Sequence, residues 1–112
     1  MTEKTFKNLY KQTNIYSIQD IIKANENAGK YFFSKHNMRF FNSRILSDLY
    51  PSADKFYFVT SEQGPSNVRK YSVRSFDPDT CNIETVGDFG AYDSAYQAKK
   101  AAKLTAEKGG AK

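Results

Sequence analysis

Apolar side chains recur at helical spacing early in the chain and again near its end. In the early segment, polar residues separate them at intervals of three to four positions, which is typical of an amphipathic helix. Ser17 followed by Asp20 indicates a capping box at the helix start, and Gly29 indicates a left-handed helix end. The apolar positions are Ile18, Ile21, Ile22 and Ala28. We therefore predict a helix over residues 17–28.

Between residues 30 and 86 the pattern changes to short runs rich in aromatic and β-branched residues. Such runs, separated by Pro, Gly, Asn and Asp, are typical of strands joined by turns. Around Pro78, the sequence DPDT predicts a hairpin turn. The predicted strands are KYFF at 30–33, MRFFNSRIL at 38–46, KFYFVTSEQ at 55–63, RKYSVRSF at 69–76 and NIETV at 82–86.

Alternation along RKYSVRSF divides its side chains between the two faces of the predicted sheet. Because successive residues of a strand point to opposite faces, Tyr71 and Val73 are expected to face the core. Lys70, Ser72 and Arg74 are then expected on the other face.

The last apolar periodicity predicts a second helix that begins at Asp93 or Ser94 and runs to about Lys108. Small alanine side chains allow a helix to approach a sheet closely, so we expect the alanine side to pack and the lysine side to point outward. The packing side holds Ala95, Ala98, Ala102, Thr105 and Ala106, and the outward side holds Tyr96, Lys99, Lys100 and Lys103. That outward side is either an ordinary solvated surface or a site for an anion.

These elements predict one α+β domain over residues 15–108, in which an antiparallel sheet of four to five strands packs against an N-terminal and a C-terminal helix. Residues 1–14 are predicted to form a flexible arm, and residues 109–112 a frayed tail. At 112 residues the chain has room for a single core. Its 8 tyrosines and 9 phenylalanines predict that this core is aromatic.

Charge is unevenly distributed along the chain, which carries a formal net charge of +5. Residues 30–77 are predominantly basic, residues 77–93 contain acids and no base, and lysines dominate from residue 94 onward. Clustered like charges favour an anionic partner. The alternative is that the acidic segment folds back beside the basic strands and neutralises them.

Candidate catalytic chemistry is sparse. A metal site needs several converging His, Cys or carboxylate ligands, and the chain has one histidine, His36, and one cysteine, Cys81. No phosphate-binding or nucleophile motif is present, and the aspartates of DPDT are typical of a turn. We predict a protein without enzymatic activity and without a cofactor. No apolar run of about 18 residues is present and the N-terminus has no apolar signal segment, so we expect a cytoplasmic protein with no membrane contact.

Basic and aromatic residues therefore suggest a binding surface. We predict that it contacts RNA or DNA, because lysine and arginine neutralise phosphates and aromatic rings stack on bases. A host protein is the alternative partner, since Tyr and Arg are enriched in interface cores. The oligomeric state remains open. The candidate nucleic-acid-binding residues are Arg39, Arg44, Lys70, Arg74, Tyr96, Lys99, Lys100 and Lys103.

Two local motifs resemble those of double-stranded-RNA-binding domains. EQGPSNVRKY, residues 62–71, is similar to that family's glycine-proline turn, with Asn67 at the position of its histidine. The string KKAAK, residues 99–103, with Ala106 after it, resembles the pattern that opens the family's last helix. The resemblance implies that Lys99, Lys100 and Lys103 meet phosphates.

A broader resemblance extends from about residue 20 to residue 98. The motifs MRFFNSRI, YFVTSEQ and RKYSVRSFD are similar to those of a group of small uncharacterised bacteriophage proteins. The resemblance implies a phage origin and a place in the host cytoplasm. It also implies an accessory role, either binding nucleic acid or inhibiting a host protein or defence complex.

Overall fold

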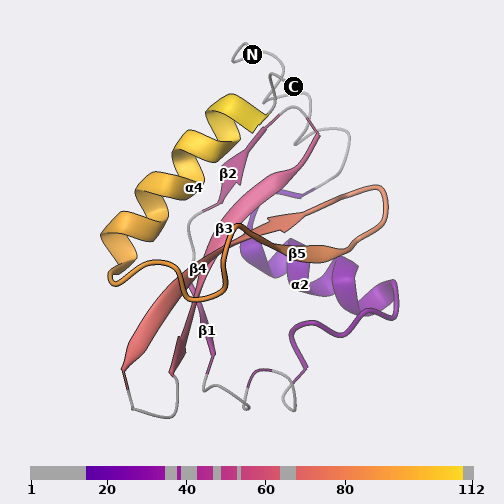
Figure 1. Ribbon diagram of the computed structural model, residues 1–112. Coiled ribbons are helices and arrows are strands. Elements are labelled where there is room, and N and C mark those ends of the chain that lie inside the picture. Colours follow the sequence, from indigo (N-terminus) through magenta and orange to yellow (C-terminus); the bar gives the residue numbers. More distant parts are fainter. Residues whose placement is uncertain are drawn as a thin grey trace.

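Two helices and five strands make up the described part of the protein (Figure 1). The structure, a computed structural model, describes residues 15–34, 38, 43–46, 49–52, 54–63 and 68–109. In chain order the elements are α2 (Ile18–Asn27), β1 (Arg44–Ile45), β2 (Tyr50–Pro51), β3 (Phe56–Gln63), β4 (Arg69–Phe76), β5 (Ile83–Val86) and α4 (Ala95–Gly109). The predicted α+β class is confirmed. The predicted arm, residues 1–14, and residues 110–112 of the predicted tail lie outside the described residues.

The two central strands, β3 and β4, form the body of an antiparallel sheet in which β5 lies beside β4. Both β1 and β2 pair with β3, at opposite ends of it: Arg44 lies opposite Ser61, and Tyr50 lies opposite Tyr57. Since β4 occupies the other side of β3, β1 and β2 are two short pieces of one sheet edge.

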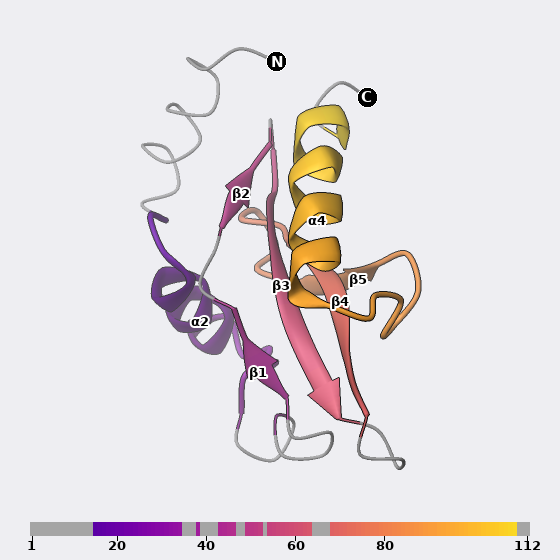
Figure 2. The same cartoon turned by 90° about the vertical axis from the view of Figure 1, so that its left-hand side faces the viewer.

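The sheet is the middle of three layers, with α2 on one side and α4 on the other (Figure 2). Alternation along β3 supplies both cores, because its even-numbered side chains face α2 and its odd-numbered ones face α4. The core on the α2 side contains Ile15, Ile18, Ile21, Phe33, Phe56, Phe58 and Phe76. The core on the α4 side contains Tyr57, Val59, Val73, Ala98, Ala102 and Ala106.

Both ends of α2 follow the predicted signals. The Asp20 carboxylate accepts hydrogen bonds from the backbone N–H groups of Tyr16 at 2.8 Å and Ser17 at 3.2 Å, which satisfies donors at the helix start. Gly29 has a φ of 77°, so it forms the expected left-handed end. The predicted bounds, 17–28, differ from the observed helix by one residue at each end.

The prediction of a strand over residues 30–33 is wrong. Tyr31 has a φ of 55°, in the left-handed region, and the segment forms a turn. The side chain of Asn25, which is fully buried on α2, accepts the N–H of Phe32 at 2.8 Å and so holds this turn against the helix. Phe33 nevertheless enters the core from the turn. Aromatic composition therefore predicted burial here, but not backbone conformation.

The region before β3 also differs from the prediction. Of the strand predicted over residues 38–46, only Arg44–Ile45 is a strand among the described residues, and 39–42 lie outside them. Tyr50–Pro51, which lies between two of the predicted strands, is the short edge strand β2. Proline is tolerated there because an edge strand does not need every N–H for pairing.

The three later strands confirm the prediction, and so does the hairpin between β4 and β5. Its turn is stabilised by the Asp77 carboxylate, which accepts the Asp79 N–H at 2.9 Å. Within the described residues, neither helix has the combination of length and hydrophobicity needed to cross a bilayer.

Candidate functional site

Helix α4 presents two chemically distinct sides. Ala98, Ala102 and Ala106 are buried against the sheet, as predicted from their spacing. The helix start is fixed by Ser94, whose hydroxyl accepts the N–H of Gln97 at 3.2 Å. Because the buried alanines pack against the sheet, the opposite side of α4 faces solvent.

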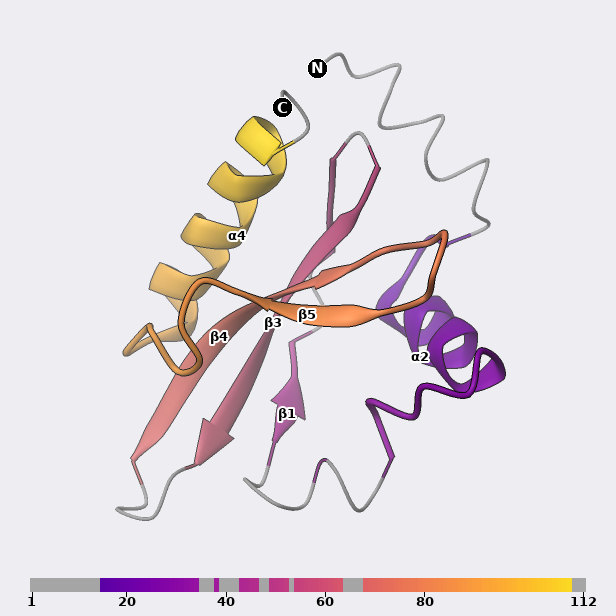
Figure 3. The same cartoon turned by 45° about the vertical axis from the view of Figure 1, so that its right-hand side comes forward.

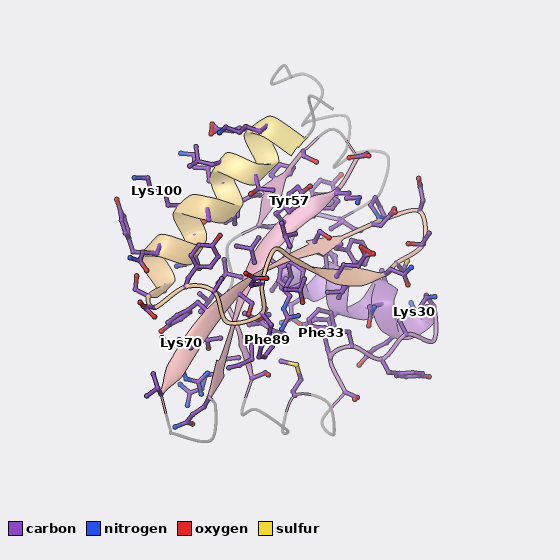
Figure 4. The ribbon with its side chains drawn as sticks, viewed as in Figure 1. Lys30, Phe33, Tyr57, Lys70, Phe89 and Lys100 are labelled. Atoms are coloured by element: carbon purple, nitrogen blue, oxygen red, sulfur yellow. The ribbon has the colours of Figure 1, made fainter. Side chains whose placement is uncertain are left out.

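The outward side of α4 carries the predicted cations, and we call Tyr96, Lys99, Lys100 and Lys103 the lysine face. Tyr96 is 73% exposed, and Lys100 and Lys103 are also exposed. Lys99 is partly buried at the flank of the helix. Figure 4 shows the Lys100 side chain standing away from the sheet. The structure therefore brings all four predicted residues of α4 onto one side.

Two arginines lie on the α4 side of the sheet, close to the end of β3. Arg44 on β1 is exposed and lies opposite Ser61. Arg69 on β4 donates from Nη1 to the Ser61 hydroxyl at 2.7 Å. Arg69 is not among the candidates predicted from the sequence. Alternation along β4 places it on the same face as Tyr71 and Val73, and that face is predicted to pack in the core. That face is only partly covered at this end, which alternation alone does not show.

Lys70 and Arg74 are used within the chain. Lys70 forms an ion pair with Asp93, so the acidic segment does fold back on a basic strand at this point. Arg74 is 8% exposed and its Nη2 lies 3.2 Å from Glu62 Oε2. Arg74 does share a face with Lys70 and Ser72 as predicted, but this position is buried and not on an open binding surface. Arg39, the remaining candidate, lies outside the described residues.

The Arg74 side chain lines a pocket of about 200 Å³. It was not predicted, since its members are spread along the chain from Phe32 to Phe89. We call it the Arg74 pocket, and its lining residues besides Arg74 are Phe32, Met38, Ser43, Thr60, Glu62 and Phe89. The segment after β5, which carries Phe89, returns across the sheet before it reaches α4 (Figure 3). A pattern of strand alternation gives no information on such a covering segment.

Residues suited to metal binding do not gather in the described part of the chain: no group of three or more His, Cys, Asp or Glu side chains lies together there. Cys81 is partly buried, and its sulfur lies 3.9 Å from the Pro78 carbonyl oxygen. Among the described residues, the lysine face and the Arg74 pocket are two candidate surfaces for function.

Fold and surfaces together define a small α+β protein with a cationic helix face on one side of its sheet and a buried arginine–glutamate pair on the other. The sequence model of a family of unknown function, DUF7447, matches residues 17–103. The chain belongs to this family. The match begins at the residue that caps α2 and ends at Lys103 on the lysine face. No curated protein and no solved structure matches the chain.

Proposed function

We propose that this protein binds nucleic acid and that the lysine face of α4 makes the phosphate contacts. The observation that supports the proposal is the contrast in pairing among the candidate cations. Lys70 and Arg74 have carboxylate partners, whereas Lys100 and Lys103 extend into solvent with no ion pair to a described residue. Exposed ammonium groups on one helix face are suited to neutralising phosphates.

The placement of these lysines is unfavourable for the helix by itself. Lys99 and Lys100 lie near the helix start, where the helix dipole favours acids. Lys99 and Lys103 are four residues apart, a spacing at which like charges destabilise a helix by about 0.2–0.5 kcal/mol. An anionic ligand would offset both costs.

Two further features of the same side fit a polynucleotide. Tyr96 is largely exposed beside the lysines, so its ring is available to stack on an unpaired base. Arg44 and Arg69, on the α4 side of the sheet, add cations without belonging to the helix. Because phosphate contacts carry no sequence information, we expect binding with little sequence preference.

The test is a salt titration of binding, with fluorescently labelled single-stranded and duplex RNA and DNA followed by anisotropy. If the three lysines of the lysine face each meet a phosphate, the logarithm of the association constant should fall against the logarithm of salt with a slope of about −2 to −3. A slope near zero would contradict phosphate binding.

A charge-reversal pair locates the site. The double variant Lys100→Glu with Lys103→Glu should weaken binding at least about tenfold. Its control is Lys23→Glu with Lys30→Glu, which changes the net charge equally at exposed lysines near α2. Figure 4 shows Lys30 on the side of the molecule away from Lys100. Equal losses in the two variants would show that net charge, and not the lysine face, determines binding.

An inhibitor of a host protein is the second candidate function, and one observation favours it. Leu104 is 45% exposed on α4, eight residues after the 73% exposed Tyr96, and exposed aliphatic and aromatic side chains on one helix are suited to a protein interface. Such an interface would depend weakly on salt. Leu104→Ala would weaken it while leaving nucleic-acid affinity unchanged. The phage origin, the cytoplasmic location and the lack of enzymatic activity stay predictions from the sequence.

A further inference from the structure

The Arg74 pocket lies on the α2 side of the sheet, where the aromatic core gives way to polar residues. Along β3, Phe56 and Phe58 face α2, and the next two residues on that face are Thr60 and Glu62. Both are buried, as is Arg74 opposite Phe58 on β4. The chain thus buries an arginine–glutamate ion pair on the same face of the sheet as Phe56 and Phe58.

Arg74 retains hydrogen-bonding capacity in this position. Its Nε donates to the Thr60 hydroxyl at 2.9 Å, its Nη1 to the Thr85 hydroxyl, and its Nη2 to Glu62 Oε2 at 3.2 Å. A guanidinium has five N–H donors, two of them on each Nη. With respect to the described residues, one N–H on each Nη is therefore left for a ligand.

Glu62 likewise retains acceptor capacity. Its Oε1 accepts the Ser72 hydroxyl at 2.9 Å and its Oε2 accepts Arg74. An ionised carboxylate has about four acceptor positions, so two remain. The pocket therefore combines N–H donors with carboxylate acceptors on an ion pair whose charges cancel.

Aromatic rings form two walls of the pocket. The Arg74 guanidinium carbon lies 5.3 Å from the ring centroids of both Phe32 and Phe89. Phe89 is 51% exposed, so this wall of the pocket lies at the surface of the protein. A volume of about 200 Å³ is below the 300 Å³ or more that is usual for drug-sized ligands, and it limits an occupant to about one ring system.

We propose that the Arg74 pocket binds a nucleobase, either in a free nucleoside or as a single unpaired base of a strand. A nucleobase presents a donor and an acceptor side by side on a flat, neutral ring. The donor can reach Glu62, the acceptor can reach Arg74, and the ring faces can lie against Phe32 or Phe89. The carboxylate of Glu62 disfavours an anion in the same place.

This proposal is independent of the lysine face. The pocket lies on the α2 side of the sheet and α4 lies on the other, so either site can fail without the other. Charge reversal at Lys100 and Lys103 should leave nucleoside binding unchanged.

The experiment is a titration of ¹⁵N-labelled protein with uridine, cytidine, adenosine and guanosine, followed by NMR. At least one nucleoside should cause saturable shifts of the amide of Gly90, which donates to the Ser72 hydroxyl at 2.8 Å, and of the amides of Phe89 and Thr85. Benzoate, a flat anion, should bind more weakly. The absence of saturable shifts with all four nucleosides up to about 10 mM would overturn the proposal, as would tighter binding of benzoate.

Phe89→Ala is the matching variant, because its side chain is half exposed and its loss should leave the fold intact. It should weaken nucleoside binding about tenfold. Val68→Ala is the control, since Val68 is equally exposed at 51% and does not line the pocket. Equal affinity of Phe89→Ala and the wild type would overturn the assignment to this pocket.

Titration with a short single-stranded oligonucleotide distinguishes a base in a strand from a base in a free nucleoside. If the pocket takes a base from a strand, excess nucleoside should compete with the oligonucleotide and Phe89→Ala should weaken its binding. If the pocket serves free nucleosides, the oligonucleotide should leave the Gly90 amide unshifted. Both outcomes support the pocket and assign its ligand.

Discussion

On the α4 side of the sheet, Lys100 and Lys103 stand in solvent on a helix whose inner side is alanine, whereas on the α2 side Arg74 is buried and bound to Glu62. The difference comes from what covers each face. Alanines let α4 lie flat on the sheet, so its long side chains point outward. On the other face, the segment carrying Phe89 closes over the polar end of the sheet. The covering element, and not the charge of the strand, decides which cations can meet a ligand.

The largest effect should come from the aromatic core on the α2 side. Phe58 is fully buried, and its ring centroid lies 6.1 Å from that of Phe33. Phe58→Ala should lower the free energy of unfolding by about 3–5 kcal/mol, a large part of the total of about 5–15 kcal/mol expected for a domain. Denaturant unfolding followed by circular dichroism measures this loss. A loss below about 1 kcal/mol would mean that the α2 core does not hold the fold.

The buried ion pair should give a comparable effect that disappears when both partners change. Arg74→Met leaves Glu62 buried without its partner and should lower the free energy of unfolding by about 3–5 kcal/mol. The double variant with Glu62→Met should be near the wild type, or more stable by about 1–4 kcal/mol. Chemical denaturation of the three proteins measures both values. If the double variant is as unstable as the single one, the hydrogen bonds to Thr60 and Thr85 are what stabilise the wild type.

A smaller loss should follow from enlarging the alanine side of α4. Ala102 is fully buried against the sheet, so Ala102→Leu should push the helix outward and lower the free energy of unfolding by about 1–3 kcal/mol. The control is Glu107→Leu on the exposed side of the same helix, which should change stability by less than about 0.5 kcal/mol. Thermal unfolding of the two variants makes the comparison, and equal melting temperatures would argue against close helix–sheet packing.

The smallest effect on stability should come from the lysine face. Lys103→Ala removes an unfavourable i,i+4 pair with Lys99 and a favourable i,i+4 pair with Glu107, so the two terms nearly cancel and the free energy of unfolding should change by at most about 0.5 kcal/mol. The same change should reduce the salt slope of nucleic-acid binding by about 1. Anisotropy titrations at several salt concentrations measure this slope. An unchanged slope would exclude Lys103 from the phosphate contacts.

Local signals in the sequence were sufficient to predict the two helices, because residues close in the sequence determine where each helix ends and which side of it packs. Asp20 and Gly29 marked the ends of α2, and the alanine spacing gave the inner side of α4 correctly. The three lysines and the one tyrosine of the lysine face followed from the same helical spacing.

Features that depend on distant residues could not be predicted in this way. Strand propensity suggested a strand at residues 30–33, but a hydrogen bond from Phe32 to the buried Asn25 holds a turn. Alternation assigned Arg74 to a face without showing that Phe32 and Phe89 cover it. The unpartnered positions on that ion pair likewise become visible only when strands β3, β4 and β5 are placed side by side.

The division of one sheet edge into β1 and β2 has a consequence for behaviour at high concentration. Each piece is two residues long, and the strand on the opposite edge, β5, has four residues. Within the described residues, neither edge of the sheet thus presents a long row of unpaired backbone N–H and C=O groups to a second molecule. Aromatic strands such as these are prone to amyloid-like stacking when a long border is exposed. The short edge strands should therefore help to keep the folded protein from aggregating.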